Sequence, residues 1–180
     1  MRTSDAIEHI KRHQVNNFSG HLNYQTRENQ HLGRFSFSNG KIVNCEFKNL
    51  TGKKAFYRLF VDMGFFSERI FVAEPESINS FLTDHSLALK PLLDELNNIF
   101  EATKKDIKAR PPGDLFIELK IGIIDEIPLG KNEFTLSKDI VRFQQVEKIY
   151  QQSELLPFEV TKALVSLRGK KIIKTKKIMN

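Results

Sequence analysis

Apolar side chains recur at two different spacings near the start of the chain, and these spacings predict a helix followed by a strand. Residues 4–15 show the three-to-four-residue spacing of an amphipathic helix, and Ser4 is suited to cap it. Residues 18–24 show the alternation of a strand, with Leu22 and Tyr24 pointing the same way. The first elements are therefore expected to be one helix and one strand.

The clearest local signal is a β-hairpin. Residues 33–38 and 43–47 each alternate apolar with polar or small side chains. Asn39-Gly40 lies between them, and this dipeptide favours a tight hairpin turn because both residues tolerate positive φ. We therefore expect an antiparallel pair of strands here.

A short helix is predicted over Lys53–Met63. Gly64 is expected to end this helix, residues 65–72 are rich in β-forming side chains, and Pro75 closes the first domain. One side of the helix is apolar, and the other carries Lys53, Lys54, Tyr57 and Arg58.

Helical spacing dominates the middle of the chain, from Ile78 to Ile107. Pro91 lies within this run, and proline removes a backbone donor and clashes with the preceding turn of a helix. A break or kink is therefore expected between Thr83 and Pro91. Residues 110–113, Arg-Pro-Pro-Gly, end the helical stretch and are typical of a linker.

The last part of the chain shows the order of a helix-turn-helix followed by a strand. After a short apolar segment at 115–124, one helix is predicted over 138–152 and a second from Pro157 to Gly169. Residues 172–178 then favour a strand or wing.

These segments predict an α+β fold with three parts. Residues 1–76 form a small antiparallel sheet with a flanking helix, and residues 77–112 form a long helical connector with a Pro-rich linker. Residues 113–180 form a winged-helix-like, α-rich C-terminal domain.

Composition narrows the setting of this fold. Apolar residues make up 40% of the chain and charged residues 28%, which is ordinary for a globular protein. The sequence has neither an apolar run of the roughly 18 residues that a membrane span needs nor a signal-peptide core. A single cysteine, Cys45, excludes an internal disulfide. Together these features favour the cytoplasm.

The excess positive charge is confined to the last quarter of the chain. Residues 138–180 carry ten Lys or Arg against four Asp or Glu, whereas the rest of the chain carries 18 of each sign. Such asymmetry indicates nucleic acid, an acidic protein or an anionic membrane as a partner, and a solvated tail that aids solubility is the simpler alternative. The candidate binding residues are Lys162, Arg168, Lys170, Lys171, Lys174, Lys176 and Lys177.

No motif of an enzyme stands out. Gly52-Lys53-Lys54 lacks the second glycine and the Ser or Thr of a phosphate-binding loop. The sequence also lacks a serine elbow, a Cys–His nucleophile context and a dinucleotide-binding glycine pattern. We therefore expect a protein that is not an enzyme and uses no cofactor.

Two further patterns are better explained by structure than by chemistry. His9 and His13 could share a helix face as metal ligands, but no flanking signature supports a metal site, and two solvated histidines are the simpler interpretation. Asp94-Glu95 is expected on a helix surface or in a salt bridge between elements, and Asp125-Glu126 in a loop. Adjacent carboxylates on a helix diverge by about 100°, so neither pair suits acid–base catalysis.

Residues 5–75 resemble the PATAN domain, the N-terminal module of PatA-type bacterial response regulators. The family pattern reads Ser-Gly-x-Leu, Gly-x-Leu-x-Phe-x-Asn-Gly-x-Ile-Val, Gly-x-x-Ala-Leu-x-x-Leu and Gly-x-Phe. Phe35 and Phe56 stand where the pattern has smaller aliphatic residues, and Cys45 falls near a position that is often alanine. The matching segments are 18–22, 33–43, 51–59 and 64–66, with further likeness at 92–95 and 155–164.

The resemblance implies a non-enzymatic module of bacterial signalling, found beside receiver domains and motility or small-GTPase genes. No receiver domain is predicted in this chain, because no acidic cluster and phospho-acceptor Asp follow a strand. The first hypothesis is therefore an adaptor or scaffold that recognises another protein, such as a response regulator or a small-GTPase component.

The second hypothesis is a DNA-binding regulator that uses the basic C-terminal segment. Its recognition helix would begin near Glu159, would offer only Lys162 and Arg168 as cations, and would lack an Asn or Gln suited to adenine. A carboxylate near the groove repels phosphate, so docking to protein is the favoured use. Self-association through the 78–109 helix, giving a homodimer, is compatible with either hypothesis.

Overall fold

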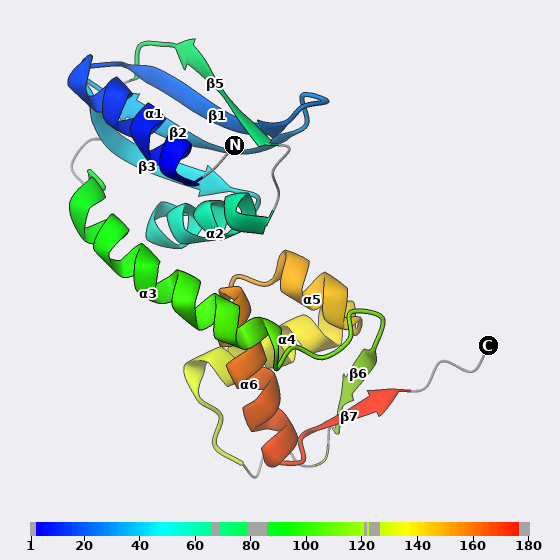
Figure 1. The fold of residues 1–180 in the computed structure, drawn as a ribbon. Helices are drawn as coiled ribbons and strands as arrows, with labels where there is room; N and C mark the ends of the chain where they lie inside the picture. The colour runs from blue at the N-terminus through cyan, green and yellow to red at the C-terminus, as the bar shows by residue number, and fades with distance from the viewer. Residues whose placement is uncertain (1–2, 66–68, 79–85, 121, 123–126, 177–180) are drawn as a thin grey trace. The chain divides into compact units, whose positions relative to one another are not determined.

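The computed structural model describes residues 3–65, 69–78, 86–120, 122 and 127–176 of the 180-residue chain (Figure 1). The chain divides into two compact units, Met1–Phe100 and Glu101–Asn180. The described residues form a five-stranded antiparallel sheet, a two-stranded sheet and six helices, so the predicted α+β class is confirmed.

The first unit is built on the five-stranded sheet, with the strand order β4-β3-β2-β1-β5. Asn39 and Gly40 have φ values of 48° and 75° and join β2 to β3, which confirms the hairpin that this dipeptide predicts. The strands are β1 (Gly20–Thr26), β2 (His31–Ser38), β3 (Lys41–Phe47), β4 (Leu50–Thr51) and β5 (Arg69–Pro75). The expected strand at 65–72 thus lies later in the chain, because α2 extends to Phe65.

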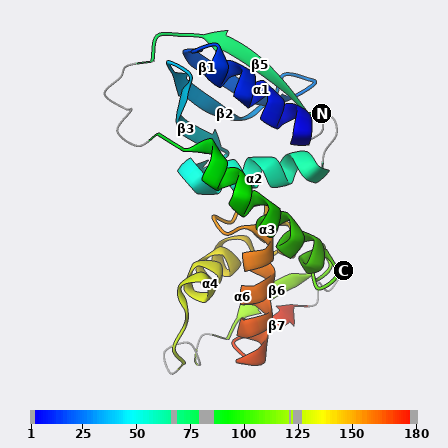
Figure 2. The same ribbon diagram turned by 60° about the vertical axis from the view of Figure 1, so that its left-hand side comes forward.

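Two helices, α1 (Thr3–Val15) and α2 (Gly52–Phe65), belong to this unit (Figures 1 and 2). Its core is rich in phenylalanine: Phe35, Phe56 and Phe60 are fully buried and their rings contact one another. The prediction that Tyr57 lies on the polar side of α2 was wrong. Tyr57 is only 4% exposed, and its hydroxyl donates a hydrogen bond to the carboxylate of Glu95.

Helix α3 (Leu89–Ile107) accommodates Pro91 in its first turn, where a missing backbone N–H costs nothing. Residues 86–88 are not helical, so the expected break before Pro91 is confirmed there, while residues 79–85, including His85, lie outside the described residues. The expected salt bridge at Asp94-Glu95 is present, because Glu95 pairs with Lys53 of α2 at 3.3 Å. Asp125-Glu126 lies outside the described residues.

The second unit contains β6 (Phe116–Leu119), α4 (Lys131–Phe143), α5 (Val146–Gln152), α6 (Pro157–Gly169) and β7 (Ile173–Lys176). The single helix predicted over 138–152 was wrong: α4 begins earlier, and Gln144, with a φ of 57°, separates it from α5. The break allows the backbone on either side of it to form hydrogen bonds with the segment 115–117. The N–H of Ile117 donates to the carbonyl of Gln144, and the N–H of Val146 donates to the carbonyl of Leu115.

The predicted strand at 172–178 is present over Ile173–Lys176 as β7, and residues 177 and 178 lie outside the described residues. Strand β7 pairs with β6, which precedes all three helices of the unit. Fully buried Leu136, Ile140, Val146 and Leu167 lie in the core that the helices and this small sheet share. Helix α5, a short turn, helix α6 and a strand thus follow one another in the predicted order, and the small sheet is made from both ends of the unit.

None of the helices in the described parts of the chain combines the length and the apolar composition needed to cross a bilayer. Among the described residues the longest helix is α3, which has nineteen residues and carries charged side chains along its length.

Candidate functional site

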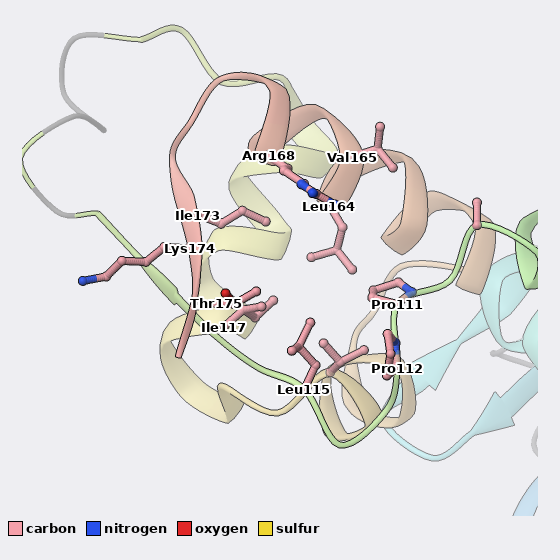
Figure 3. Close-up of a pocket in the computed structure, with 12 residues that line it drawn as sticks. Pro111, Pro112, Leu115, Ile117, Leu164, Val165, Arg168, Ile173, Lys174 and Thr175 are labelled. Atoms are coloured by element: carbon pink, nitrogen blue, oxygen red, sulfur yellow. The ribbon is translucent and has the colours of Figure 1, made fainter. Parts of the chain in front are cut away.

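An apolar groove of about 490 Å³ lies in the second unit, between α6, the two-stranded sheet and the segment 109–112 (Figure 3). It is lined by Ala109, Pro111, Pro112, Leu115, Ile117, Val146, Leu164, Val165, Arg168, Ile173, Lys174 and Thr175. Most of these side chains converge on the space between α6 and β7, whereas the Lys174 side chain extends away from it (Figure 3). The groove is large enough for several side chains of a partner.

Helix α6 forms one wall of the groove, and its start is held by three contacts. Pro157 occupies the first helical position, which suits its fixed φ. The N–H of Leu156 donates to Glu159 at 2.8 Å, and the N–H of Leu155 donates to the Ser153 hydroxyl at 3.1 Å. These bonds satisfy backbone groups that a short turn would otherwise leave unpaired, so the direction of α6 is well defined.

The floor and the rim of the groove differ in exposure. Ile117 and Leu164 are 4% and 5% exposed and form part of the floor. Val165 is 60% exposed, although it is a β-branched aliphatic residue on a helix that is otherwise well packed. Val165 therefore adds an exposed apolar side chain to the rim of the apolar groove.

Arg168 lies one turn after Val165, on the same side of α6, and also lines the groove. Its side chain is exposed, and none of the described carboxylates pairs with it. The groove therefore joins apolar walls to a cation that is free to meet an acidic group.

Lys170, unlike Arg168, already has an acidic partner within the unit. Its ammonium pairs with Glu133 of α4 at 2.7 Å and donates to the carbonyl of Pro128 at 2.9 Å. Glu133 also accepts hydrogen bonds from Ser166 and from the N–H of Gly130, each at 2.6 Å. The hydrogen bonds from Lys170 and Ser166 lower the pKa of Glu133 to about 2, so the carboxylate stays charged and links α4 to α6.

Lys174 is also paired within the unit. Its ammonium lies 2.8 Å from Glu118, its cross-strand neighbour on β6. Lys176 belongs to β7, but its side chain is outside the described residues, and so is the whole of Lys177. Two of the predicted cations, Lys170 and Lys174, are therefore each paired with one carboxylate of the same unit.

The remaining predicted cations lie apart from one another. Lys162 is exposed on α6, with its ammonium 5.5 Å from the centre of the Phe158 ring. Lys171 is exposed in the turn between α6 and β7, where it has a φ of 60°. The structure thus brings Arg168 to the groove, whereas the side chain of Lys174 extends away from it and Lys162, Lys170 and Lys171 lie elsewhere on the unit.

Sequence analysis missed Glu133 and the groove itself. The signal for Glu133 was present, because a Glu three residues after Gly130 matches half of a capping box at a helix start. The groove had no such signal. It depends on the pairing of β6 with β7 and on the position of Pro111 and Pro112, both of which require the folded chain.

Two histidines of the first unit make ring contacts and polar contacts with neighbouring residues. His13 packs against Phe18 at 4.4 Å between ring centres, and burial, with neighbouring His9 and Arg12, lowers its pKa. On β1 and β2, His21 contacts the Ser36 hydroxyl at 3.1 Å and Glu76 at 3.2 Å. Among the described residues no cluster of His, Cys, Asp or Glu could hold a metal ion.

Comparison with known proteins leaves the family open. No protein-family model, no curated protein and no solved structure matches the chain. The resemblance to the PATAN domain therefore stays a prediction from the residues that carry it, and function must be argued from the groove and its charges.

Proposed function

We propose that this protein is a non-enzymatic adaptor or scaffold that binds another protein through the groove beside α6. The observation that carries the proposal is the combination of a groove of about 490 Å³ with two residues on its rim, the exposed Val165 and Arg168, with which none of the described carboxylates pairs. Apolar area supplies most of the free energy of association between proteins, and a rim charge adds selectivity.

The ion pairs of the unit favour a protein over a duplex. Binding to the DNA backbone requires several lysines or arginines that are free to meet phosphates. Lys170 and Lys174 already have carboxylate partners at 2.7 and 2.8 Å, and a phosphate would have to compete with these carboxylates. Glu159 is held at the start of α6 by the N–H of Leu156, so a negative charge stays near the end of the helix that would enter a major groove.

The resemblance of residues 5–75 to the PATAN domain supports a role in bacterial signal transduction, in the cytoplasm. A response regulator or a component of a small-GTPase system is the partner that this resemblance suggests. On this proposal the first unit and the groove of the second unit are both surfaces for recognition, and no chemistry is performed on the partner.

The alternative function is a DNA-binding regulator, and one observation favours it. Lys162, Arg168 and Lys171 are exposed, and none of the described carboxylates pairs with them. Three exposed cations on and after α6 are a minimal set for phosphate contacts, fewer than most non-specific duplex binders use.

The first prediction separates these functions by fluorescence anisotropy of a labelled random DNA duplex at about 50 and 200 mM salt. We expect no binding tighter than about 100 µM at the higher salt, because only three of the described candidate cations, Lys162, Arg168 and Lys171, have no described carboxylate partner. Any residual binding at low salt should disappear when Lys162, Arg168 and Lys171 are changed to Glu.

Lys170 and Lys174 are left intact in that variant, because Lys170→Glu would place a second carboxylate against Glu133 and destabilise the unit. Micromolar binding at about 200 mM salt that the triple variant abolishes would overturn the adaptor proposal and establish the regulator. Absence of binding at both salt concentrations would leave protein recognition as the function to pursue.

A direct test of the adaptor function compares two exposed valines. Val165 is 60% exposed on the groove rim, and Val141 is 66% exposed on α4 and does not line the groove. Binding to a purified response regulator or GTPase-linked protein should be weakened at least about tenfold by Val165→Glu and be unchanged by Val141→Glu. Equal effects of the two substitutions would count against the groove.

A further inference from the structure

One edge of the β7 backbone is hydrogen-bonded to β6, and the other edge has no hydrogen-bond partner among the described residues. The N–H of Lys120 donates to the carbonyl of Ile172, and Glu118 faces Lys174 in the same antiparallel ladder. Because hydrogen-bonded residues alternate along such a ladder, the backbone groups of Ile173 and Thr175 face away from β6. No described residue supplies a hydrogen-bond partner for them on that side.

The side chains of the same two residues line the groove. Ile173 and Thr175 point toward the space that α6 and Pro111 border, as Figure 3 shows, while Lys174 points to the opposite face of the sheet. An open strand edge and an apolar groove therefore meet at β7. A strand added along this edge would gain main-chain hydrogen bonds and would place every second side chain in the groove.

We propose that the groove and the open edge of β7 bind an extended segment of a partner protein, in which apolar side chains alternate with Asp or Glu. The apolar side chains would enter the groove beside Val165 and Ile173. The acidic side chains would lie on the other face of the sheet, next to Lys174. The Lys174 ammonium lies 2.8 Å from Glu118, but its side chain is 54% exposed and its three N–H donors allow it to contact a second carboxylate from the added strand. This inference rests on the proposed adaptor function and specifies the kind of segment that the adaptor recognises.

Charge selects this occupant over a second copy of the chain. Two β7 strands paired edge to edge in antiparallel fashion would place Lys174 of one copy opposite a lysine of the other. Like charges directly opposite one another destabilise a strand pair, and lysine on an edge strand is a common protection against self-association. A strand with Asp or Glu at the facing position converts this repulsion into attraction.

The test uses a fluorescein-labelled nine-residue peptide in which Val alternates with Glu, titrated by anisotropy with the full chain up to about 200 µM. We expect saturable binding. Replacing every Glu by Lys, or methylating alternate backbone nitrogens of the peptide, should weaken binding at least about tenfold, because the first change reverses the charge and the second removes the N–H donors.

Variants of the protein locate the site. Thr175→Pro removes an N–H that faces the open edge and leaves the ladder with β6 intact, and Val165→Glu places a charge on the groove rim. Each should weaken peptide binding at least about tenfold, and Val141→Glu, an equally exposed valine off the groove, should not change it. Far-UV circular dichroism and thermal unfolding verify that each variant is folded, and Val165→Glu tests the site even if Thr175→Pro is unstable.

Several results would overturn the inference. Failure of the alternating peptide to bind, or undiminished binding of the methylated peptide, excludes strand addition. A dimer in sedimentation that Thr175→Pro abolishes assigns the edge to a second copy. Competition by a random DNA duplex assigns the surface to nucleic acid and overturns the proposed function as well. If neither the peptide nor the DNA duplex binds, only the strand-addition inference is overturned, and the proposed adaptor function is unaffected.

Discussion

Glu133→Gln is expected to lower the free energy of unfolding of the second unit by about 2–3 kcal/mol. Glu133 receives hydrogen bonds from Lys170, Ser166 and the N–H of Gly130, and its side chain is only 11% exposed. Glutamine keeps the size of the side chain but loses the charge, which leaves the Lys170 ammonium without its partner. Urea unfolding followed by hydrogen exchange of α4 and α6 amides would measure the loss in this unit separately.

Glu147 provides the matched control. It is an exposed glutamate of α5 in the same unit. Among the described residues, its side chain accepts one side-chain hydrogen bond, from the amide of Gln151 at 3.1 Å. Glu147→Gln should change stability by less than about 0.5 kcal/mol, as expected of an exposed pair. Equal losses for the two glutamines would show that the link from α4 to α6 contributes nothing special.

Acid should have the same effect as the substitution. The pKa of Glu133 is about 2 in the folded chain and near its ordinary value of 4.5 when unfolded. A lowered folded-state pKa means that the stabilisation is complete above about pH 5 and is lost as the pH falls from about 4.5 to 2. The difference in stability between the wild-type chain and Glu133→Gln should therefore shrink over that interval.

Phe35→Ala is expected to destabilise the first unit by about 3–5 kcal/mol, the largest effect that we predict. Phe35 is fully buried on β2, and its ring centre lies 5.9 Å from those of both Phe56 and Phe71. Removing this ring leaves a cavity among aromatic neighbours that have little freedom to fill it. Chemical unfolding monitored by hydrogen exchange of the β1 and β2 amides would report on this unit.

Leucine substitutions test whether two of these phenylalanines act as a pair. Phe35 and Phe56 both stand where the PATAN pattern has smaller aliphatic residues, and their rings make an edge-on contact at 72°. Phe35→Leu and Phe56→Leu should each cost about 1–2 kcal/mol, and the double variant should be less destabilised than the sum by about 0.5–1.5 kcal/mol. Strict additivity would mean that the two departures from the pattern are independent.

Local signals were enough to predict the first half of the fold. The hairpin at Asn39-Gly40, the start of α2 near Lys53 and the disruption before Pro91 each depend on residues that are close in sequence. Turn chemistry and proline geometry act over a few residues, so they can be recognised without knowledge of the fold. The end of α2 at Phe65 was missed because Gly64, which the sequence marks as a helix end, lies within the helix.

The second unit was harder to predict, because distant pairings decide its structure. Gln144 breaks the helix at a point where the helical spacing of apolar residues continues. The break allows two backbone hydrogen bonds, one with Ile117 of β6 and one with Leu115 just before it. The same holds for the candidate site. Lys170 was counted as a free cation, but Glu133, which neutralises it, lies far away in sequence and comes close only in the folded unit. Charge counting cannot show which cations have partners.

The pairing of β6 with β7 also constrains the order in which the chain can fold during synthesis. Strand β6 leaves the ribosome before α4, α5 and α6 have been made, and its partner β7 follows all three. Until then, the backbone of β6 is open on the side that β7 will cover, whereas β2 meets β3 as soon as the Asn39-Gly40 turn forms. Chain closure over a long segment is slower than closure of a hairpin. The first unit is therefore expected to fold while the second is still being synthesised, and a nascent second unit is the stage at which protection by a chaperone would matter most.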